Sequence, residues 1–374
     1  MSMLALKPPM GWNAWNYFGY RDINERVVRE TADAMVEQGF RDCGYDIVSV
    51  DDAWLCPVRD ANGNLQPNPE RFPSGMKALG DYIHERGLKF GLYAGAGVIT
   101  YARCAGSFGY ERQDAKKFAE WGVDLLKYDF GYAAPGQNET HLYRKMGQAL
   151  RESGRDIIFS GCLGRKSVSE WMKSCGANLW RLSGDITDNW DSILKVATDA
   201  VGLEAFSGHS AWNDPDMMVV GLNGEGYVGK IGGGCTTNEY EAHFALWCML
   251  CAPLLMGHDV RTTTPEIKTI LQNKELIDIN QDDLGIAAFK VPPLSNNDFI
   301  LAKPLYGGDI AFCLLNTQET PKIMPLAWDY CGWEITDTVS LRDVIEHKEI
   351  GRFTGGMCAN VQPHSVKVFR ATRI

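Results

Sequence analysis

The sequence predicts an α/β protein, a (β/α)8 TIM barrel over residues 1–285 followed by a small antiparallel β-sandwich over residues 286–374. Eight alternations of short apolar runs with amphipathic helical stretches suit a closed barrel of parallel strands. The Gly-rich segments lack the spacing and context of a dinucleotide-binding turn, which argues against an open doubly wound sheet. After Gly285 the helical periodicity ends, and short strands with Gly, Pro and Asn turns follow.

The barrel strands are expected where short apolar runs are bounded by turn residues or by polar side chains. The seventh strand has a weaker pattern than the others. In chain order the strands are predicted at residues 9–15, 45–51, 88–93, 123–129, 156–160, 178–182, near 204–207, and at 253–256.

The helices are expected where apolar residues recur with helical spacing, and several have recognisable ends. The first closes at Gly39, and Ser74 occupies the N-cap position of the second. The helices are predicted at residues 23–39, 74–87, 113–121, 139–153, 167–174, 191–201, 238–251 and 265–272. The C-terminal strands are predicted at residues 299–305, 309–316, 333–341 and 366–372.

The charge and composition narrow the class of partner. A formal net charge of −10 over 374 residues, without any Lys/Arg cluster, disfavours binding to nucleic acid or to an anionic membrane. No signal peptide and no long apolar run is recognisable, so we expect a soluble, cytoplasmic protein. Small neutral molecules are the expected partners, and a homo-oligomer stays open.

The cysteine pattern favours reduced thiols over a disulfide framework, because the 11 Cys are odd in number and scattered. Cys248 and Cys251 form a CxxC, but they fall inside an apolar helical stretch without a second pair. We therefore expect neither a zinc site nor any other metal or cofactor there.

Polar and aromatic residues gather where the predicted strands end. The fourth strand ends in Lys127-Tyr128-Asp129, which places Lys127 and Asp129 on the same side of the strand. A cation beside Asp129 would keep that carboxylate ionised. Because barrel chemistry lies at the C-terminal ends of the strands, several such ends together predict a polar pocket with aromatic walls. The other ends carry Trp12 to Trp15, Asp51 to Trp54, Tyr93, Arg181 to Asp185, Trp212 to Asp216, and His258-Asp259.

Two chemistries fit a rim rich in carboxylates. In the first, two carboxylates flank a glycosidic bond while aromatic rings stack on the sugar. In the second, a divalent metal is held for hydrolysis or aldol chemistry, with Asp51, Asp52, His209, Asp214 and Asp216 as ligands. The abundance of Trp favours the sugar, and no His spacing supports the metal.

Six blocks of sequence, in this order, resemble the signature blocks of glycoside hydrolase family 27, the α-galactosidases and α-N-acetylgalactosaminidases. The ordered set spans nearly the whole chain and is far more specific than any single block. The blocks are Pro8-Pro9-Met10-Gly11-Trp12-Asn13, Asp51-Asp52-Ala53-Trp54, Leu125-Leu126-Lys127-Tyr128-Asp129, Trp212-Asn213-Asp214-Pro215-Asp216-Met217, Ala252-Pro253-Leu254-Leu255 and Asn280-Gln281-Asp282.

The resemblance implies a retaining exo-glycosidase that uses neither metal nor cofactor on a small carbohydrate substrate. Asp129 matches the family's nucleophile, and Asp185 matches its general acid/base. The other matched positions contact the sugar or wall the pocket. They are Trp12, Asp51, Asp52, Tyr93, Lys127, Cys162, Arg181 and Asp216.

The charges add expectations of their own. Lys127 should hold Asp129 ionised, and the charge of Asp129 should raise the pKa of Asp185, which must donate a proton, while Arg181 should lower it. Asp214 also fits a turn cap, and Asp52 also fits a role in holding a loop. Trp15 and Trp54 also fit ordinary packing at the top of the barrel.

The chain departs from the family's pattern in two places. Cys104 matches one half of a common disulfide, but the other half falls at or near Gly131, so no bridge is expected. Cys162-Leu163-Gly164 stands where many α-galactosidases have Cys-Glu-Trp facing the sugar's C2 substituent. The expected activity is that of an α-galactosidase, and α-N-acetylgalactosaminidase and β-L-arabinopyranosidase are the alternatives within the family. Outside it stand a metal-dependent barrel enzyme and an inactive sugar-binding protein.

Overall fold

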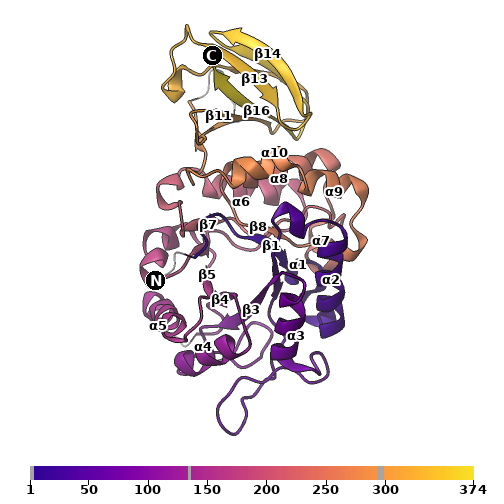
Figure 1. Ribbon diagram of the computed structural model, residues 1–374, viewed down its shortest axis with the longest axis vertical. Helices are drawn as coiled ribbons and strands as arrows, with labels where there is room; N and C mark the ends of the chain where they lie inside the picture. The colour runs from indigo at the N-terminus through magenta and orange to yellow at the C-terminus, as the bar shows by residue number, and fades with distance from the viewer. Residues whose placement is uncertain (1–3, 134–135, 293–298) are drawn as a thin grey trace.

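A computed structural model describes residues 4–133, 136–292 and 299–374, and eight parallel strands form its central sheet (Figure 1). The strands neighbour one another in the order β7-β6-β5-β4-β3-β2-β1-β8. Backbone hydrogen bonds around Met218, which lies just after β7, join that end of the sheet to β8. The sheet therefore closes, and the predicted TIM barrel is confirmed. The strands are β1 (Met10–Asn13), β2 (Ile47–Val50), β3 (Lys89–Gly95), β4 (Leu125–Asp129), β5 (Ile158–Cys162), β6 (Leu179–Arg181), β7 (Trp212–Asp214) and β8 (Leu254–Met256).

Helices surround the barrel and cover the outer face of its strands (Figure 1). Most of the predicted helices are present, with ends that differ by a few residues. Helices α1, α7 and α10 were not predicted. The helices are α1 (Trp15–Asp22), α2 (Glu25–Glu37), α3 (Gly75–His84), α4 (Glu111–Glu120), α5 (Glu139–Glu152), α6 (Trp190–Ala200), α7 (Gly226–Gly232), α8 (Thr237–Met249), α9 (Pro265–Leu271) and α10 (Lys274–Asn280).

Two predicted elements of the barrel are wrong. Residues 204–207 contain a short 3-10 helix, Glu204–Phe206, and the seventh strand lies farther on at Trp212–Asp214. The helix predicted at 167–174 is two 3-10 turns, Lys166–Glu170 and Met172–Cys175. The true seventh strand is short and contains Asn and Asp, so it lacks the apolar run by which the other strands are recognised.

The C-terminal strands form two antiparallel sheets. The larger has the order β14-β13-β16-β11-β10-β9, and the smaller pairs β12 with β15. The predicted antiparallel β-sandwich is confirmed, although β9, β12, β14 and β15 were not predicted. The strands are β9 (Phe289–Lys290), β10 (Phe299–Pro304), β11 (Ile310–Asn316), β12 (Lys322–Leu326), β13 (Thr338–Asp343), β14 (Lys348–Thr354), β15 (Met357–Val361) and β16 (Ser365–Arg373).

Helix α8 lies between the barrel and the C-terminal sheet (Figure 1). It is apolar on all sides, and its residues from Tyr240 to Met249 are buried with the exception of Glu241. Alternate residues of β11 divide between two cores. Ala311 and Cys313 join the barrel's core, whereas Phe312 and Leu314 join the core of the sandwich. The barrel's core thus extends onto one face of the C-terminal sheet, and the opposite face of that sheet has a core of its own.

Candidate active site

A cavity of about 520 Å³ opens at the C-terminal ends of the barrel strands. Every predicted site residue except Trp12 lines it. These residues are Asp51, Asp52, Tyr93, Lys127, Asp129, Cys162, Arg181, Asp185 and Asp216. They come from loops or strand ends that are far apart in the sequence, and the parallel register of the barrel brings them to one rim.

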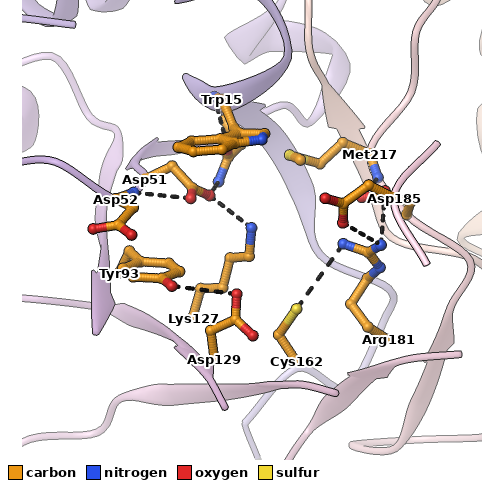
Figure 2. A network of polar contacts seen from close by, with 12 residues as sticks. Trp15, Asp51, Asp52, Tyr93, Lys127, Asp129, Cys162, Arg181, Asp185 and Met217 are labelled. Atoms are coloured by element: carbon orange, nitrogen blue, oxygen red, sulfur yellow. Dashed lines mark hydrogen bonds and ion pairs between the residues drawn. The ribbon is translucent and has the colours of Figure 1, made fainter. Parts of the chain in front are cut away.

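Lys127 binds Asp51 rather than Asp129. The ammonium Nζ lies 2.7 Å from Oδ2 of Asp51, and the side chain of Asn13 donates to the same oxygen at 2.8 Å (Figure 2). Lys127 thus donates no hydrogen bond to Asp129, but its charge lowers the pKa of Asp129 and so favours the ionised form, as expected. The pKa of Lys127 is nevertheless raised, because the neighbouring acidic groups, Asp51 foremost, outweigh the effect of burial.

Asp129 accepts hydrogen bonds from two partners at the end of β4. The Phe130 backbone N–H donates to Oδ1 at 2.8 Å, and the Tyr93 hydroxyl donates to Oδ2 at 3.3 Å. Burial raises the pKa of Asp129 to about 6, although the charge of Lys127 acts in the opposite direction. Asp129 is therefore mostly ionised at neutral pH and protonated in mild acid.

Asp185 has a different environment from Asp129. Its side chain is 75% exposed, and Arg181 Nη2 lies 3.1 Å from its Oδ1. Burial of its surroundings favours the neutral form, but the charges of Arg181 and Lys127 outweigh this and lower the pKa of Asp185. The charge of Asp129 was expected to raise the pKa of Asp185, but in the free site the positive charges of Arg181 and Lys127 have the larger effect. Without substrate, Asp185 is ionised at neutral pH.

Arg181 also forms a buried ion pair with Asp216, at 2.8 Å between Nη2 and Oδ2. The backbone N–H groups of Ile186 and Met217 donate to the two oxygens of Asp216. Burial raises the pKa of Asp216 to about 7, with Arg181 opposing the shift. Asp216 has a φ of 138°, which is rare for a residue with a side chain, and Asp214 accepts its backbone N–H at 3.0 Å. Asp214 therefore caps this turn.

The carboxylate of Asp52 holds the loop that follows β3. Its oxygens accept the Thr100 hydroxyl at 2.7 Å and the Ala102 backbone N–H at 2.8 Å. Burial raises the pKa of Asp52, although these hydrogen bonds act in the opposite direction. Asp52 still lines the cavity, so it combines the loop-holding role with a position beside the substrate.

Trp12 does not wall the cavity, and that prediction is wrong. Its side chain is fully buried, and its indole N–H donates to the His258 carbonyl at 2.9 Å. Neighbouring side chains on a strand point to opposite faces, and Asn13 faces Asp51 inside the barrel, so Trp12 must face the helices. Trp15, at the start of α1, supplies the aromatic wall instead (Figure 2).

The mouth of the cavity carries an aromatic pair that the sequence reasoning missed. Tyr101 lines the cavity, and its ring centroid lies 5.5 Å from that of Tyr132. Arg103 lies over the Tyr132 ring at 4.3 Å. A backbone hydrogen bond from Tyr132 to Ile99 joins the loops after β3 and β4. Tyr101 and Tyr132 are 50% and 43% exposed, and two exposed aromatics in separate loops had no signal in the sequence.

Cys162, Leu163 and Gly164 line one side of the cavity, as the resemblance implies, with the Cys162 thiol 4.0 Å from Arg181 Nη1. Several other lining residues were not predicted. Lining side chains that lie next to predicted residues in the sequence could have been found by proximity to them. They are Asn16, Phe130, Ser183 and Met217. Trp54 is fully buried and donates to the Tyr93 carbonyl, so its role is packing.

All 11 cysteines are free thiols, including Cys104. At Gly131, where the resemblance puts the partner half of a disulfide, φ is +60° and an added Cβ would meet the Ile99 carbonyl oxygen at 3.0 Å. A cysteine at that position would therefore be strained. The hydrogen bond between Tyr132 and Ile99 links the two loops there.

The residues considered as metal ligands do not converge. His209 is exposed and contacts the Leu6 carbonyl, away from the cavity. Over residues 4–133, 136–292 and 299–374, no three or more His, Cys, Asp or Glu side chains are arranged to hold a metal ion. Within the same residues, no helix is both long enough and apolar enough to cross a membrane.

Comparisons with known proteins agree with the geometry of the site. A family model described as alpha galactosidase A matches residues 7–282, and one described as the alpha galactosidase C-terminal beta sandwich domain matches residues 299–371. An alpha-galactosidase of Cyamopsis tetragonoloba is 43% identical, and the match covers 99% of this chain and 87% of that protein. Alpha-N-acetylgalactosaminidase of Gallus gallus is 40% identical over 81% of this chain and 77% of that protein.

A solved structure extends the likeness to three dimensions. Alpha-galactosidase I of Mortierella vinacea superposes with a TM-score of 0.92 at 30% sequence identity, and the match covers 99% of this chain and 98% of that one. Both family models and the full-length relatives identify the same family. The chain therefore belongs to the α-galactosidase family of glycoside hydrolases, glycoside hydrolase family 27.

Proposed function

We propose that the protein removes terminal α-galactosyl residues with retention of configuration, through a covalent glycosyl ester on Asp129. The observation that carries the proposal is one cavity lined by Asp129 and Asp185, two carboxylates in contrasting environments. Such a pair is what a double displacement at a sugar carbon requires. The relatives named alpha-galactosidase support galactose as the sugar.

In the first step the ionised Asp129 attacks the anomeric carbon of the sugar. Its hydrogen bonds from Phe130 and Tyr93 fix the orientation of the carboxylate. Asp185 gives its proton to the departing glycosidic oxygen, since an alcohol leaves more easily than an alkoxide. The side chain of Asp185 is exposed at the cavity mouth, where the leaving group departs.

In the second step Asp185 acts as a base. Asp129 is then a neutral ester, and Arg181 holds Asp185 in the ionised form that can take a proton from water. The water attacks the anomeric carbon from the side that the leaving group vacated, so the two inversions restore the original configuration. The low pKa of Asp185 thus favours this step over the first.

The remaining polar residues of the cavity are proposed to bind the sugar's hydroxyls. Asp51 and Lys127 form one ion pair and Arg181 and Asp216 another, on different strands of the rim. Each pair offers both a donor and an acceptor, which is what a hydroxyl requires. Asp51 and Asp52 together favour a sugar with a C6 hydroxyl, which argues against arabinopyranose.

α-N-Acetylgalactosaminidase is the second candidate, and a specific observation favours it. Cys162-Leu163-Gly164 brings no Glu and no Trp to its side of the cavity. The small side chains leave room for an acetamido group at C2, and the Gallus gallus relative carries that activity in its name. The relative rates of hydrolysis of an aryl α-galactoside and an aryl α-N-acetylgalactosaminide decide between the two activities.

The leaving group is proposed to be a sugar. Burial raises the pKa of Tyr101 to about 12, and the nearby charges of Asp129 and Asp185 act in the same direction. The Tyr101–Tyr132 pair therefore borders the position of the departing oxygen. Exposed tyrosine rings bind the apolar face of a sugar ring well.

The decisive experiment compares hydrolysis of aryl α-galactoside, α-N-acetylgalactosaminide and β-L-arabinopyranoside by the protein and by Asp129→Asn. We expect the α-galactoside to have the highest kcat/KM and Asp129→Asn to be inactive. The released sugar, followed by NMR, should first appear as the α-anomer. A β-anomer as first product, or full activity of Asp129→Asn, would refute the mechanism.

A cytoplasmic location is also proposed. The 11 free thiols, and the strain that a cysteine would meet at Gly131, support a protein adapted to a reducing compartment. Fractionation of the source cells with an activity assay tests this. Activity found mainly outside the cytoplasm would contradict it.

A further inference from the structure

Cys251 and Lys303 form an isolated pair at the junction of the barrel and the C-terminal sheet. Cys251 follows α8, Lys303 lies on β10, and 2.9 Å separates the thiol Sγ from the ammonium Nζ. Both residues are fully buried. The pair lies among the residues that begin the barrel strands, such as Ile47 and Leu125, at the end opposite the candidate active site.

The ammonium of Lys303 has the Cys251 sulfur and one backbone carbonyl as its hydrogen-bond partners. Nζ donates to the Ile286 carbonyl at 2.6 Å, and among the described residues no carboxylate lies within ion-pair distance. Asp282 acts on Cys251 only at longer range, and its carboxylate accepts the backbone N–H of Tyr306. A buried ammonium without an anionic partner is costly, so the charge of Lys303 favours the thiolate form of Cys251 and opposes the larger effect of burial on the pKa of that thiol.

A comparison with Cys248, in the last turn of the same helix, supports this role of the lysine. Burial raises the pKa of both thiols, but Lys303 counteracts the shift at Cys251 far more directly, through a contact that Cys248 lacks. Because the thiolate is the form that oxidants attack, Cys251 is the more reactive of the two.

We propose that Cys251 and Lys303 are the site of a covalent, reversible N–O–S bridge that forms in the presence of peroxide. Once the Lys303 ammonium has released one proton to water, the S–H bond and one N–H bond break, and an S–O bond and an N–O bond form around one oxygen atom. Sulfur and nitrogen each lose two electrons, and two molecules of hydrogen peroxide accept these four. One of the four peroxide oxygens enters the bridge, and three leave as water with the thiol hydrogen and one amine hydrogen.

The geometry favours this product over the alternatives. The 2.9 Å separation is close to the span of a single bridging atom and too long for a direct S–N bond. No second thiol of the chain is bonded to Cys251, so a disulfide does not compete. Ile286, whose carbonyl accepts from Lys303, is 42% exposed, which places the pair only one layer below the surface within reach of a small oxidant.

The bridge would tie the end of α8 to β10 across 52 positions of the sequence. A cross-link of that span restricts the unfolded chain and raises the unfolding temperature. Because the pair lies at the far end of the barrel from the cavity, glycoside hydrolysis should not change. The proposal is therefore independent of the proposed function.

The test is mass spectrometry of the full-length protein after exposure to hydrogen peroxide. The protein is unfolded, its free thiols are alkylated, and it is digested. We expect the peptides of Cys251 and Lys303 to appear as one species, with the summed mass plus one oxygen and minus two hydrogens, and to separate on reduction with dithiothreitol. Oxidised wild type should also unfold several degrees above the reduced protein.

Three controls define the outcome. Cys313, buried on β11 with burial as the sole cause of its raised pKa, should be recovered as a free thiol from the same sample. Cys251→Ser and Lys303→Arg should give no linked species and no dependence of the unfolding temperature on reduction. The proposal is overturned if wild-type Cys251 is recovered as an alkylated thiol or a sulfinic acid beside an unmodified Lys303. That result comes from wild type, so it stands even if a variant fails to fold.

Discussion

Lys127 lies near two buried carboxylates and donates its hydrogen bond to Asp51. Asp129 consequently keeps a pKa of about 6, with burial only partly offset by the charge of Lys127. Asp185, bonded to Arg181, has a lowered pKa. When the free enzyme carries a single proton on this pair, that proton is therefore mainly on Asp129, whereas the first step requires it on Asp185. The reactive form, with Asp129 ionised and Asp185 protonated, is a minority at every pH.

This order of pKa values predicts the pH profile. For a sugar leaving group, kcat/KM should be level between the pKa of Asp185 and about 6, and fall about tenfold per pH unit above that. In Asp185→Ala, with a dinitrophenyl leaving group that needs no proton, kcat/KM should instead rise with pH through about 6 and stay level. Initial rates over a pH series check this. A fall above pH 6 in Asp185→Ala would contradict the assignment.

A second prediction concerns stability. A carboxyl whose pKa rises from 3.8 to about 6 on folding favours the folded state below 3.8, and this contribution is lost as the pH rises through about 6. Asp129→Asn should therefore be more stable than wild type at pH 7.5, by about 3 kcal/mol. The difference should vanish near pH 4. Thermal unfolding at the two pH values measures it.

Asp185→Asn is the matched control for that measurement. The pKa of Asp185 is lowered on folding, so its contribution to stability is present above the unfolded value and lost in acid. The substitution should therefore not stabilise the protein at pH 7.5. An equal gain from both variants would mean that net charge, rather than burial at Asp129, sets the effect.

Among the elements, β1 shows how far sequence reasoning reaches. The strand itself was predicted, but the resemblance placed Trp12 in the pocket, where the structure has Trp15 instead. Because side chains alternate along a strand, knowing that Asn13 faces inward would have shown that Trp12 faces away from the cavity. That assignment depends on a contact with Asp51, 38 residues away, which local pattern does not reveal.

Strand ends were predicted more reliably than the loops beyond them. Asp51, Asp129 and Arg181 follow apolar runs that the period of a buried strand makes visible. Tyr101 and Tyr132 meet through two irregular loops, and the direction of their side chains depends on one backbone hydrogen bond. Short polar strands such as β7 cannot be predicted from the local sequence for a related reason, since they are defined by hydrogen bonds to neighbouring strands of the barrel.

The loop pair leads to a prediction about the leaving group. Tyr132→Ala should lower kcat/KM for an α-galactosyl oligosaccharide about fivefold, because a stacked ring contributes on the order of 1 kcal/mol. The loss should be smaller for α-galactosyl fluoride, whose leaving group is not a sugar. Steady-state rates for the two substrates give the comparison, with Tyr132→Phe, which keeps the ring, as the control. Equal losses for both substrates would indicate a structural role only.

For the whole molecule, the architecture followed from the sequence because two different periodicities divide the chain. Helix and strand alternate through the barrel, and strands alone follow it. The packing between the two parts could not be predicted in this way. The run of apolar residues in the second half of α8, from Phe244 to Met249, was the local sign of an element buried on both sides.

That packing predicts the effect of truncation. A chain ending at residue 292 would expose the face of α8 that Ala311, Cys313 and other residues of the C-terminal sheet now cover. We expect such a chain to aggregate or to lose cooperative unfolding, which scattering and calorimetry would detect. The full-length protein under the same conditions is the control. A stable, monomeric and active barrel would contradict the prediction.

The position of α8 also bears on motion. Domains joined through a small polar interface commonly swing relative to each other, whereas a shared apolar core resists such movement. With one side of α8 against the barrel and the other against the C-terminal sheet, neither part can tilt without opening a cavity in the interior. The molecule should thus behave mechanically as one rigid body, and substrate would enter through movement of the rim loops alone.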